Sequence, residues 1–482
     1  MSHHSTAGGL RTLASGLALA AVAAAVPLLA AGTATAHART TAAVTVPQAW
    51  AEPAKVTTRT AVRDVRELVL TADGTAVALW TQRPAAAGAD ALYAAVRRPG
   101  ATAWGAPRRL GAAQIHEVKL VAVGAGATAL WTDAPGGGYT ATRLVSASLA
   151  GGSWSAAVPV ATARAGHKLS RPGLAAAADG TVTAAWGDGR PESYAAPKEV
   201  RTATRPASGR WSAAVTVSRP VNSYTGLYGT AQVAVDRRGT TVIAYTQADS
   251  EESSRVLTVT RRAGSRTWSA PALRFRGYGR APAVLAEGPA AGSLALVWQD
   301  GSPDHMGHGP VHVATTADAA AGWPVVRRTA EPEGLAGRPA RPQLDRAGTV
   351  TLLWTDGQSR LLTAALPRAA DRWSPVEALS SGPSIAGYDV STGPDGTARV
   401  LWTERRTFPA QELVQAVRPA GGRWTVAPMR AAAGPGLDAE VVAGPGGRAL
   451  AVWSRQDTPD AGTLWAAGSV PVPAVAGRTG RS

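Results

Sequence analysis

The stretch TADGTAVALWTQ, residues 71–82, recurs with small changes along this chain of 482 residues. It returns as ADGTVTAAWGD at 178–188, as RAGTVTLLWTD at 346–356 and as GPDGTARVLWTE at 393–404. An aromatic residue closes each of eight copies, at Trp80, Trp131, Trp186, Tyr245, Trp298, Trp354, Trp402 and Trp453. Successive aromatics are 48 to 59 residues apart, and self-similarity at such a period indicates a repeat architecture.

A second tryptophan lies between successive copies, usually after glycine or a polar turn. It stands at Trp50, Trp104, Trp154, Trp211, Trp268, Trp323, Trp373 and Trp424. Fifteen of the sixteen tryptophans therefore occupy repeat positions. A tryptophan at a fixed place in every repeat favours packing in the core or between repeats over a platform for a ligand.

Each copy reads as four short β-strands. In the third copy an apolar stretch before Asp179 runs into an Asp-Gly turn and then into the alternating segment that ends at Trp186. A third strand follows a variable polar loop, and a Trp-led fourth strand such as WSAAVTV at 211–217 completes the unit. Two-residue turns between alternating segments are a strong hairpin signal. Four antiparallel strands in about 40 to 50 residues are the blade unit of an all-β propeller.

The two ends of the repeat region predict that the ring closes. A Trp-led strand from Trp50 to Thr57 stands alone at the start, and the last unit, Val441 through Leu464, lacks such a strand after it. The first strand of a propeller often completes its last blade. We therefore predict eight blades over residues 48–470, with a seven-bladed ring and one degenerate copy outside it as the alternative.

The N-terminus has the order of a secretory signal. Arg11 precedes an uncharged apolar stretch, Leu13 to Ala31, and small residues end in Ala36-His37-Ala38. We interpret residues 1–38 as a cleaved signal peptide, 39–47 as a linker and 471–482 as a disordered tail, with a single N-terminal anchor helix as the alternative. The expected location is extracellular, with no membrane span after cleavage.

The composition of the chain limits the classes of partner and cofactor that we expect. The formal charge is +16, but the basic residues are scattered with no run longer than two, so the clustering that a nucleic acid needs is missing. The absence of cysteine excludes disulfides and thiolate metal sites. We expect a monomer without a cofactor that meets an extracellular glycan or protein.

The turn before the second tryptophan resembles the Asp-box of sialidase-like, or BNR, propellers. It reads LAGGSW ending at Trp154, RAGSRTW ending at Trp268 and PAGGRW ending at Trp424. The position and the closing tryptophan match that turn, whereas the aspartate five residues before the tryptophan is missing in these three copies. The resemblance implies a propeller fold and, as one possible activity, exo-glycoside hydrolysis of the sialidase type.

Such a hydrolase needs an arginine in Arg-Ile-Pro, two further arginines for a carboxylate, an aspartic acid and a tyrosine with its glutamate. Arg-Ile-Pro is absent, although Arg171-Pro172 and Arg341-Pro342 stand roughly where it would lie. Tyr194, Tyr224, Tyr228 and Tyr388 fall in or near the loops where a nucleophile would stand. No catalytic residue can be named, and the sequence favours binding or scaffolding over catalysis.

Polar residues two places beyond the repeat aromatics predict a ring at one face of the propeller. They are Gln82, Asp133, Asp188, Gln247, Asp300, Asp356, Glu404 and Arg455. Carboxylates and amides bond sugar hydroxyls well, so the five acidic members are candidate ligand-binding residues. Stabilisation of the turn by aspartate is the alternative, because Asp-Gly follows directly at Asp188, Asp300 and Asp356.

Arg171, Arg280 and Arg341 precede first strands in three different blades and are further candidates, since three arginines facing one channel can hold a carboxylate or phosphate. Pairing with Glu67, Glu117 or Asp438 is the alternative, and the one we favour. The loop from Asp300 to Val311 with His305, His308 and the following His312 invites a metal hypothesis, but a glycine-rich loop lacks the helical geometry that makes such spacing useful, so we predict a solvated loop.

Overall fold

The computed structural model describes residues 49–469 apart from gaps at 59–60, 84–89, 113, 136–139, 191–198, 219–226, 249–252, 279–283, 289–292, 301–308, 331, 333–334, 336–339, 381, 383–384, 408–409, 435–437 and 459–460. The chain divides into two units, residues 1–44 and 45–482, and every described residue belongs to the second. The predicted signal peptide, linker and tail lie outside the described residues. The described residues contain no helix with the length and hydropathy of a membrane span.

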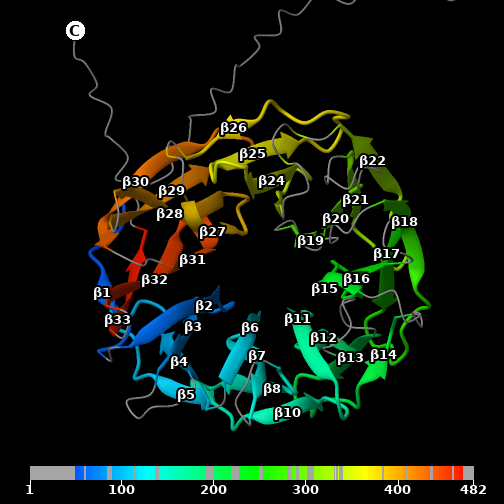
Figure 1. Cartoon of the computed structure of the whole chain (residues 1–482), viewed down its shortest axis with the longest axis horizontal. Coiled ribbons are helices and arrows are strands. Elements are labelled where there is room, and N and C mark those ends of the chain that lie inside the picture. The colour runs from blue at the N-terminus through cyan, green and yellow to red at the C-terminus, as the bar shows by residue number, and fades with distance from the viewer. Residues whose placement is uncertain are drawn as a thin grey trace, which may run out of the picture. The chain divides into compact units, whose positions relative to one another are not determined.

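Eight antiparallel sheets surround a common axis as the blades of a propeller (Figure 1). Blade 1 consists of β2 (Val62–Leu70), β3 (Ala76–Gln82), β4 (Ala91–Arg97) and β5 (Arg108–Gly111), and blade 2 of β6 (Gln114–Val123), β7 (Gly126–Ala134), β8 (Arg143–Ala150), the short β9 (Ser153–Trp154) and β10 (Val158–Thr162). Blade 3 consists of β11 (Lys168–Ala176), β12 (Val182–Gly189), β13 (Glu199–Arg205) and β14 (Val215–Thr216). Blade 4 consists of β15 (Leu227–Val235), β16 (Thr241–Ala248), β17 (Ser253–Arg261) and β18 (Ala272–Tyr278).

Blade 5 consists of β19 (Val284–Glu287), β20 (Leu294–Gln299), β21 (Val311–Thr316) and β22 (Val325–Thr329), and blade 6 of β23 (Arg341–Leu344), β24 (Val350–Thr355), β25 (Leu361–Leu366) and β26 (Glu377–Ala378). Blade 7 consists of β27 (Ile385–Thr392), β28 (Ala398–Thr407), β29 (Ala410–Arg418) and β30 (Thr425–Gly434). Blade 8 consists of β31 (Asp438–Ala443), β32 (Ala449–Thr458), β33 (Ala461–Gly468) and, from the chain start, β1 (Ala54–Lys55). The described residues include one 3-10 turn, Pro445–Gly447. The predicted all-β propeller and its eight blades are confirmed.

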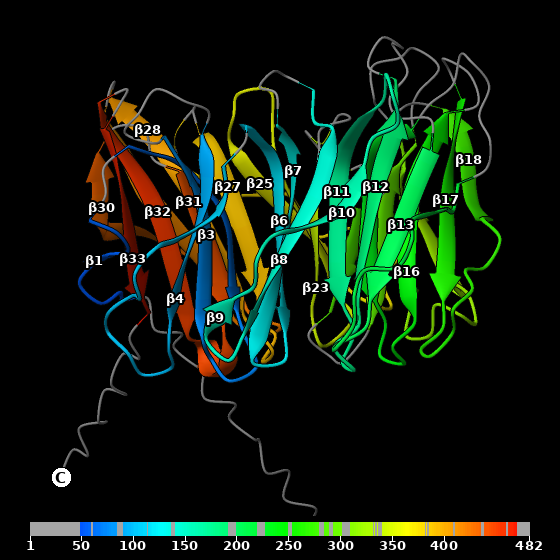
Figure 2. The ribbon, with the colours of Figure 1, turned by 90° about the horizontal axis from the view of Figure 1, so that it is seen from below.

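In each blade the first strand lies nearest the axis and the last strand lies outermost (Figure 1). The strands run between the two ends of the ring (Figure 2). Loops that join second to third strands, and one blade to the next, open at one end, which we call the loop face. Turns that join first to second and third to fourth strands lie at the other end, the turn face.

The first turns of blades 1 and 7 are built by aspartate and glycine. The Asp73 carboxylate accepts the amide of Thr75 at 3.0 Å, and Gly74 takes a φ of +84°. Asp395 accepts the amide of Thr397 at 3.0 Å in the same way. Glycine reaches this left-handed region without a Cβ clash, so the Asp-Gly pair predicted the hairpin for a sound physical reason.

The fourth strand begins later than the sequence predicted. In blade 3 the strand β14 starts four residues after Trp211, which lies in the turn. The next residue, Ser212, closes that turn: its amide donates to the Thr204 carbonyl at 2.8 Å and its hydroxyl accepts the Thr204 amide at 3.1 Å. Because this serine saturates the Thr204 backbone, regular pairing resumes only at Val215.

The repeat aromatics form the core between blades. All eight are at most 2 % exposed, which confirms their predicted packing role. Trp131 of blade 2 packs in one cluster with Val77 and Leu79 of blade 1. Each aromatic at the end of a second strand therefore buries one face of the preceding blade, so no blade is complete without its neighbour.

The chain start closes the ring. β1 pairs with β33, and Trp50 bridges Ser469. One hydrophobic cluster joins Trp80 of blade 1 with Val452 and Leu464 of blade 8. The first segment thus completes the last blade, as predicted.

Polar contacts between blades follow a repeat that sequence reasoning missed. Three arginines at the ends of third strands stack on the tryptophan of their own blade and donate to a threonine of the preceding blade. The triplets are Arg205 with Trp211 and Thr128, Arg261 with Trp268 and Thr183, and Arg418 with Trp424 and Thr351. The arginine-to-threonine bonds are 2.7, 3.2 and 2.6 Å long.

Two other junctions place apolar side chains at the same positions. Val77 of blade 1 and Leu149 of blade 2 share one hydrophobic cluster, and Ala295 of blade 5 and Leu366 of blade 6 share another. Polar side chains therefore meet polar ones and apolar side chains meet apolar ones. Because a buried polar group left unpaired is costly, this matching helps specify which blade surfaces face each other.

Replacement of Trp354, which is fully buried, with alanine is expected to lower the free energy of unfolding by about 3 to 5 kcal/mol. Denaturant unfolding followed by circular dichroism measures this loss. Val326→Ala, at a side chain 53 % exposed, is the control and should change stability by no more than about 0.5 kcal/mol. Equal effects of the two substitutions would show that the repeat aromatics do not hold the blades together.

The inter-blade pair Arg418 and Thr351 is suited to a double-mutant cycle. Arg418→Leu alone leaves the Thr351 hydroxyl without its donor and should cost about 1 to 3 kcal/mol. Adding Thr351→Val recreates the apolar pairing of Val77 with Leu149, so the double variant should lose less than the sum of the single losses. Strict additivity in thermal or urea unfolding would contradict the matching.

Candidate functional site

Two of the predicted ligand-binding carboxylates are buried and bonded to basic side chains. Asp133 receives two hydrogen bonds of 2.9 Å, from Nε and Nη2 of Arg143. Asp188 is fully buried, with His167 at 2.6 Å and Arg201 at 3.3 Å. Each of these carboxylates is satisfied within its own blade, so its oxygens are already engaged.

The other acidic members differ in setting. Asp356 stabilises its own turn, because Oδ1 accepts the amides of Gln358 and Arg360 at 2.9 Å each. Burial opposes ionisation there, but the hydrogen bonds from Arg360 hold the pKa of Asp356 below its usual value. Glu404 is buried and Asp300 is half-buried. For Asp356 the structure shows the turn-stabilising alternative, and a ligand-binding role of the five acids stays a prediction.

Two of the three candidate arginines, Arg171 and Arg341, belong to the described residues. Arg341 of blade 6 pairs with Asp389 of blade 7 at 3.0 Å. Arg171 sits at a bulge in β11 with a φ of +55°, and its amide donates to Glu117 at 2.5 Å. Arg280 lies outside the described residues.

Tyr388 is the one tyrosine candidate whose side chain is described. Its hydroxyl donates to the Leu353 carbonyl at 2.9 Å, and the Arg341 guanidinium lies 4.9 Å from the centre of its ring. Burial raises the pKa of Tyr388 to about 12. Tyr194, Tyr224 and the Tyr228 side chain lie outside what the structure describes.

His312 belongs to the core of blade 5. Its ring stacks on Trp298 with centroids 5.1 Å apart and lies 4.4 Å from the centroid of Phe275. Burial, with a contribution from Arg328, lowers the pKa of His312 to about 4 and keeps the ring neutral. His305 and His308 lie outside the described residues. Among the residues that the structure describes, no group of three His, Cys, Asp or Glu side chains is placed to hold a metal ion.

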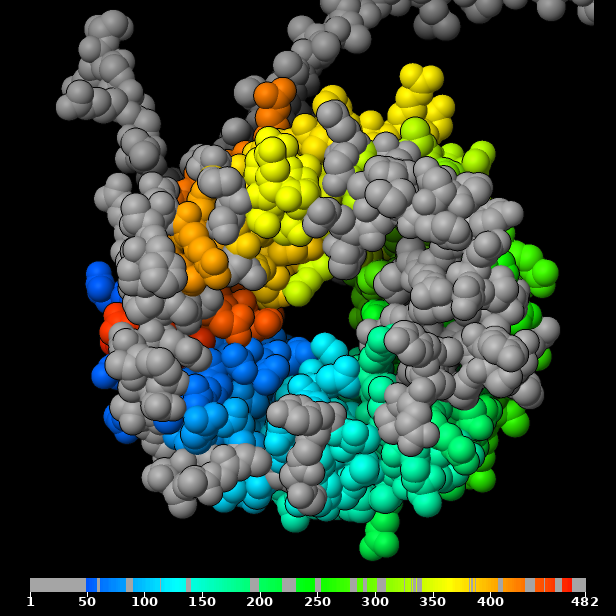
Figure 3. Space-filling view, viewed as in Figure 1, coloured from blue at the N-terminus to red at the C-terminus, as the bar shows by residue number. Residues whose placement is uncertain are grey.

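The central channel, visible in Figure 3, is lined by the exposed edges of the first strands. Carboxylates cap amides on these edges across blade junctions. Asp389 of blade 7 accepts the amide of Val441 in blade 8 at 2.9 Å, and Glu287 of blade 5 accepts that of Val235 in blade 4 at 2.9 Å. With the Glu117 bond to Arg171, these caps satisfy edge amides that would otherwise face only water.

The channel concentrates acids at the junction of blades 7, 8 and 1. Glu67 pairs with Lys119 at 2.8 Å, yet burial raises its pKa. Burial and the neighbouring Asp389 raise the pKa of Glu440. Burial and the charge of Asp64 raise the pKa of Asp438 to about 6. The folded ring therefore binds protons more tightly here than the unfolded chain does.

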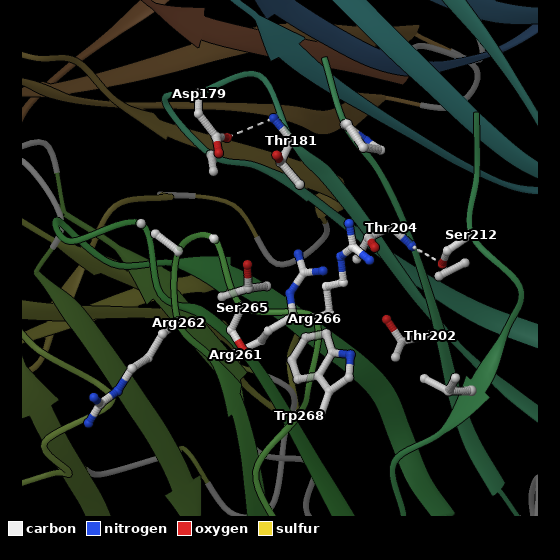
Figure 4. Close-up of a pocket in the computed structure, with 18 of the residues that line it drawn as sticks. Asp179, Thr181, Thr202, Thr204, Ser212, Arg261, Arg262, Ser265, Arg266 and Trp268 are labelled. Carbon is white, nitrogen blue, oxygen red and sulfur yellow. Dashed lines mark hydrogen bonds between the residues drawn. The ribbon is translucent and has the colours of Figure 1, made fainter. Parts of the chain in front are cut away.

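A cavity of about 620 Å³ lies between blades 3 and 4 at the turn face (Figure 4). We call it the blade 3–4 groove. Blade 3 contributes hydroxyl side chains, and blade 4 contributes the turn before its fourth strand together with Trp268. The volume falls within the range of small-ligand sites. The sequence predicted a site at the loop face instead, and much of that face lies outside the described residues.

Trp268 is fixed in the groove by an inter-blade contact. The Arg261 guanidinium lies 5.2 Å from the centre of the indole and donates to Thr183 of blade 3 at 3.2 Å. The indole is half-buried, so part of it faces the cavity (Figure 4). The aromatic surface is therefore positioned before a ligand arrives.

Hydroxyl groups and arginines form most of the remaining polar lining. The hydroxyl-bearing residues are Thr181, Thr202, Thr204, Thr241, Ser212 and Ser265. The charged residues are Arg210, Arg261, Arg262, Arg266 and Asp179. The sequence favoured packing over ligand binding for Trp268. The groove exists only where two blades meet, and the arginine-rich turns before Trp211 and Trp268 are its one trace in the sequence.

No family model matches the chain, and no curated protein matches it. Among solved structures the BP39L lectin from Burkholderia pseudomallei is 12 % identical with a TM-score of 0.49, covering 77 % of this chain and 98 % of that one. The NanB sialidase from Streptococcus pneumoniae is 10 % identical with a TM-score of 0.37, covering 88 % and 71 %. The propeller domain of the Trilobed protease from Pyrococcus furiosus is 10 % identical with a TM-score of 0.44, covering 77 % and 95 %. No family model and no curated sequence supports the Asp-box resemblance.

Asp438→Asn is expected to stabilise the ring at neutral pH. When folding raises the pKa of a carboxyl, the folded protein loses stability as the pH rises from the pKa of the unfolded chain, near 4, to the pKa in the folded state, about 6. The asparagine variant escapes that loss, so its melting temperature should exceed that of the wild type at pH 7 and approach it near pH 4. Asp371→Asn, an equal change of charge on an exposed turn, is the control in a thermal melt across this pH range. A wild-type advantage at pH 7 would contradict the crowding of acids.

Proposed function

We propose that this protein is a secreted extracellular propeller that binds a saccharide in the blade 3–4 groove. The observation that carries the proposal is the half-buried indole of Trp268, locked by Arg261 beside a wall of hydroxyls in a cavity of about 620 Å³. A sugar ring offers an apolar C–H face to an indole and hydroxyls to polar side chains, so this lining suits it.

The scaffold favours binding because the groove needs little reorganisation. Thr202 donates to the Ala184 carbonyl at 2.7 Å, and the Ser212 hydroxyl accepts the Thr204 amide at 3.1 Å. These bonds hold the wall in place, and a preorganised site loses less entropy when it binds. The secretory order of residues 1–38 supports an extracellular location, where glycans are accessible.

Binding accounts for the described residues more simply than hydrolysis does. The Tyr388 hydroxyl is bonded to a backbone carbonyl, and Arg341 is paired with Asp389. A sialidase-type site would need a tyrosine with its glutamate and free arginines facing one carboxylate. The described channel supplies paired charges instead, so the hydrolase hypothesis gains no support from it.

Trp268→Ala is expected to weaken glycan binding by about tenfold, equivalent to ~1.4 kcal/mol. Retention of the secreted protein on a glycan array, followed by calorimetry on the best ligand, measures it. Trp424→Ala is the matched control, because Trp424 has the same repeat position and the same arginine stacking but does not line the groove. Equal binding by both variants, or turnover of fluorogenic glycosides by the wild type, would overthrow the proposal.

A further inference from the structure

The blade 3–4 groove carries an excess of positive charge from both blades. Arg210 stands in the turn directly before Trp211 of blade 3, and Arg266 stands two residues before Trp268 of blade 4. Both side chains line the cavity and are exposed. Four arginines and one aspartate line the groove, which gives it a formal charge of +3.

The arginines of the groove lack the carboxylate partners found elsewhere in the ring. Arg143, Arg341 and Arg360 each bond an aspartate. Within the described part of the chain, Arg210 and Arg266 make no side-chain hydrogen bond or ion pair. The one acid of the groove, Asp179, is turned to its own backbone and accepts the Thr181 amide at 2.8 Å (Figure 4).

Arg262 and Arg261 do not add to this unpaired charge. Figure 4 shows Arg262 directed away from Trp268 and Arg266. Arg261 is occupied by Thr183 and by the indole, and burial lowers its pKa. Arg210 and Arg266, one from each blade, are thus the two guanidinium groups available to a ligand beside Trp268.

Building on the proposed function, we infer that the ligand of the groove is an acidic saccharide whose carboxylate or sulfate is held by Arg210 and Arg266 while its ring lies against Trp268. Guanidinium groups bond carboxylate and sulfate oxygens through paired N–H donors, and such charge-assisted bonds are the stronger kind. The hydroxyl lining favours a saccharide over an acidic peptide, because a sugar presents hydroxyls around its whole edge.

The test compares two double variants that remove the same charge. Arg210→Gln with Arg266→Gln alters the groove. Arg372→Gln with Arg423→Gln is the control, because these exposed arginines directly precede Trp373 and Trp424 and do not line the groove. The probes are an array of neutral, uronate-containing and sulfated oligosaccharides, with an Asp-Glu peptide as the acidic comparison, followed by calorimetry on the best ligands.

The wild type is expected to bind a uronate or a sulfated glycan about tenfold more tightly than the neutral glycan of the same backbone. The groove variant should lose this preference, and the control variant should keep it. Uronate and sulfate arms distinguish the two sources of the anion. Thermal melts of both variants show whether either has lost its fold.

Each contrary result has its own meaning. Trp268-dependent binding with no preference for acidic glycans leaves the proposed function standing and overturns the inference. Equal weakening in both double variants would show general attraction by a chain of charge +16 and overturns it as well. Binding of the acidic peptide alone, or of no glycan at all, overturns the saccharide function itself.

Discussion

Burial of the aromatic residue that ends each second strand is the interaction on which this structure depends. A four-stranded sheet has two faces and no means of covering both, so each blade needs a neighbour on either side. Trp131 fills that need against Val77 and Leu79, and Trp80 does so against blade 8. A core of this kind is stable only when the ring is complete, which explains why β1 crosses from the chain start to pair with β33.

A closed ring still leaves two strand edges in every blade. The inner edges face the channel, where Asp389, Glu287 and Glu117 accept amides across blade junctions. Gathering carboxylates in a partly desolvated channel raises the pKa of Glu440 and Asp438, so burial and the neighbouring acids oppose ionisation there. The channel charges are therefore explained by the fold before any ligand is considered.

Polar contacts between blades add specificity to the apolar core. The arginine that stacks on Trp268 also reaches Thr183 of the preceding blade, and the same arrangement recurs at two other junctions. At blades 3 and 4 this contact leaves an open groove beside the indole. Structural packing and the proposed binding site thus use the same tryptophan, which serves the core on one side and faces a cavity on the other.

Local patterns in the sequence were enough to predict the architecture. Three signals predicted four strands in each blade, the number of blades and closure of the ring: the repeated segment ending at Trp80 and its equivalents, the Asp-Gly turns, and the Trp50 segment that stands alone before the first repeat. Each of them can be read from neighbouring residues or by counting repeats. The contacts of side chains at the strand ends depend on residues that are distant in the sequence. Asp133 and Asp188 followed the aromatics as polar residues should on an open rim, but only folding showed that Arg143 and Arg201 bury and satisfy them. The groove likewise depends on two blades meeting, and no single repeat contains it. The tertiary structure alone decided which arginines are paired and which line a cavity, because that depends on distances between side chains remote in sequence.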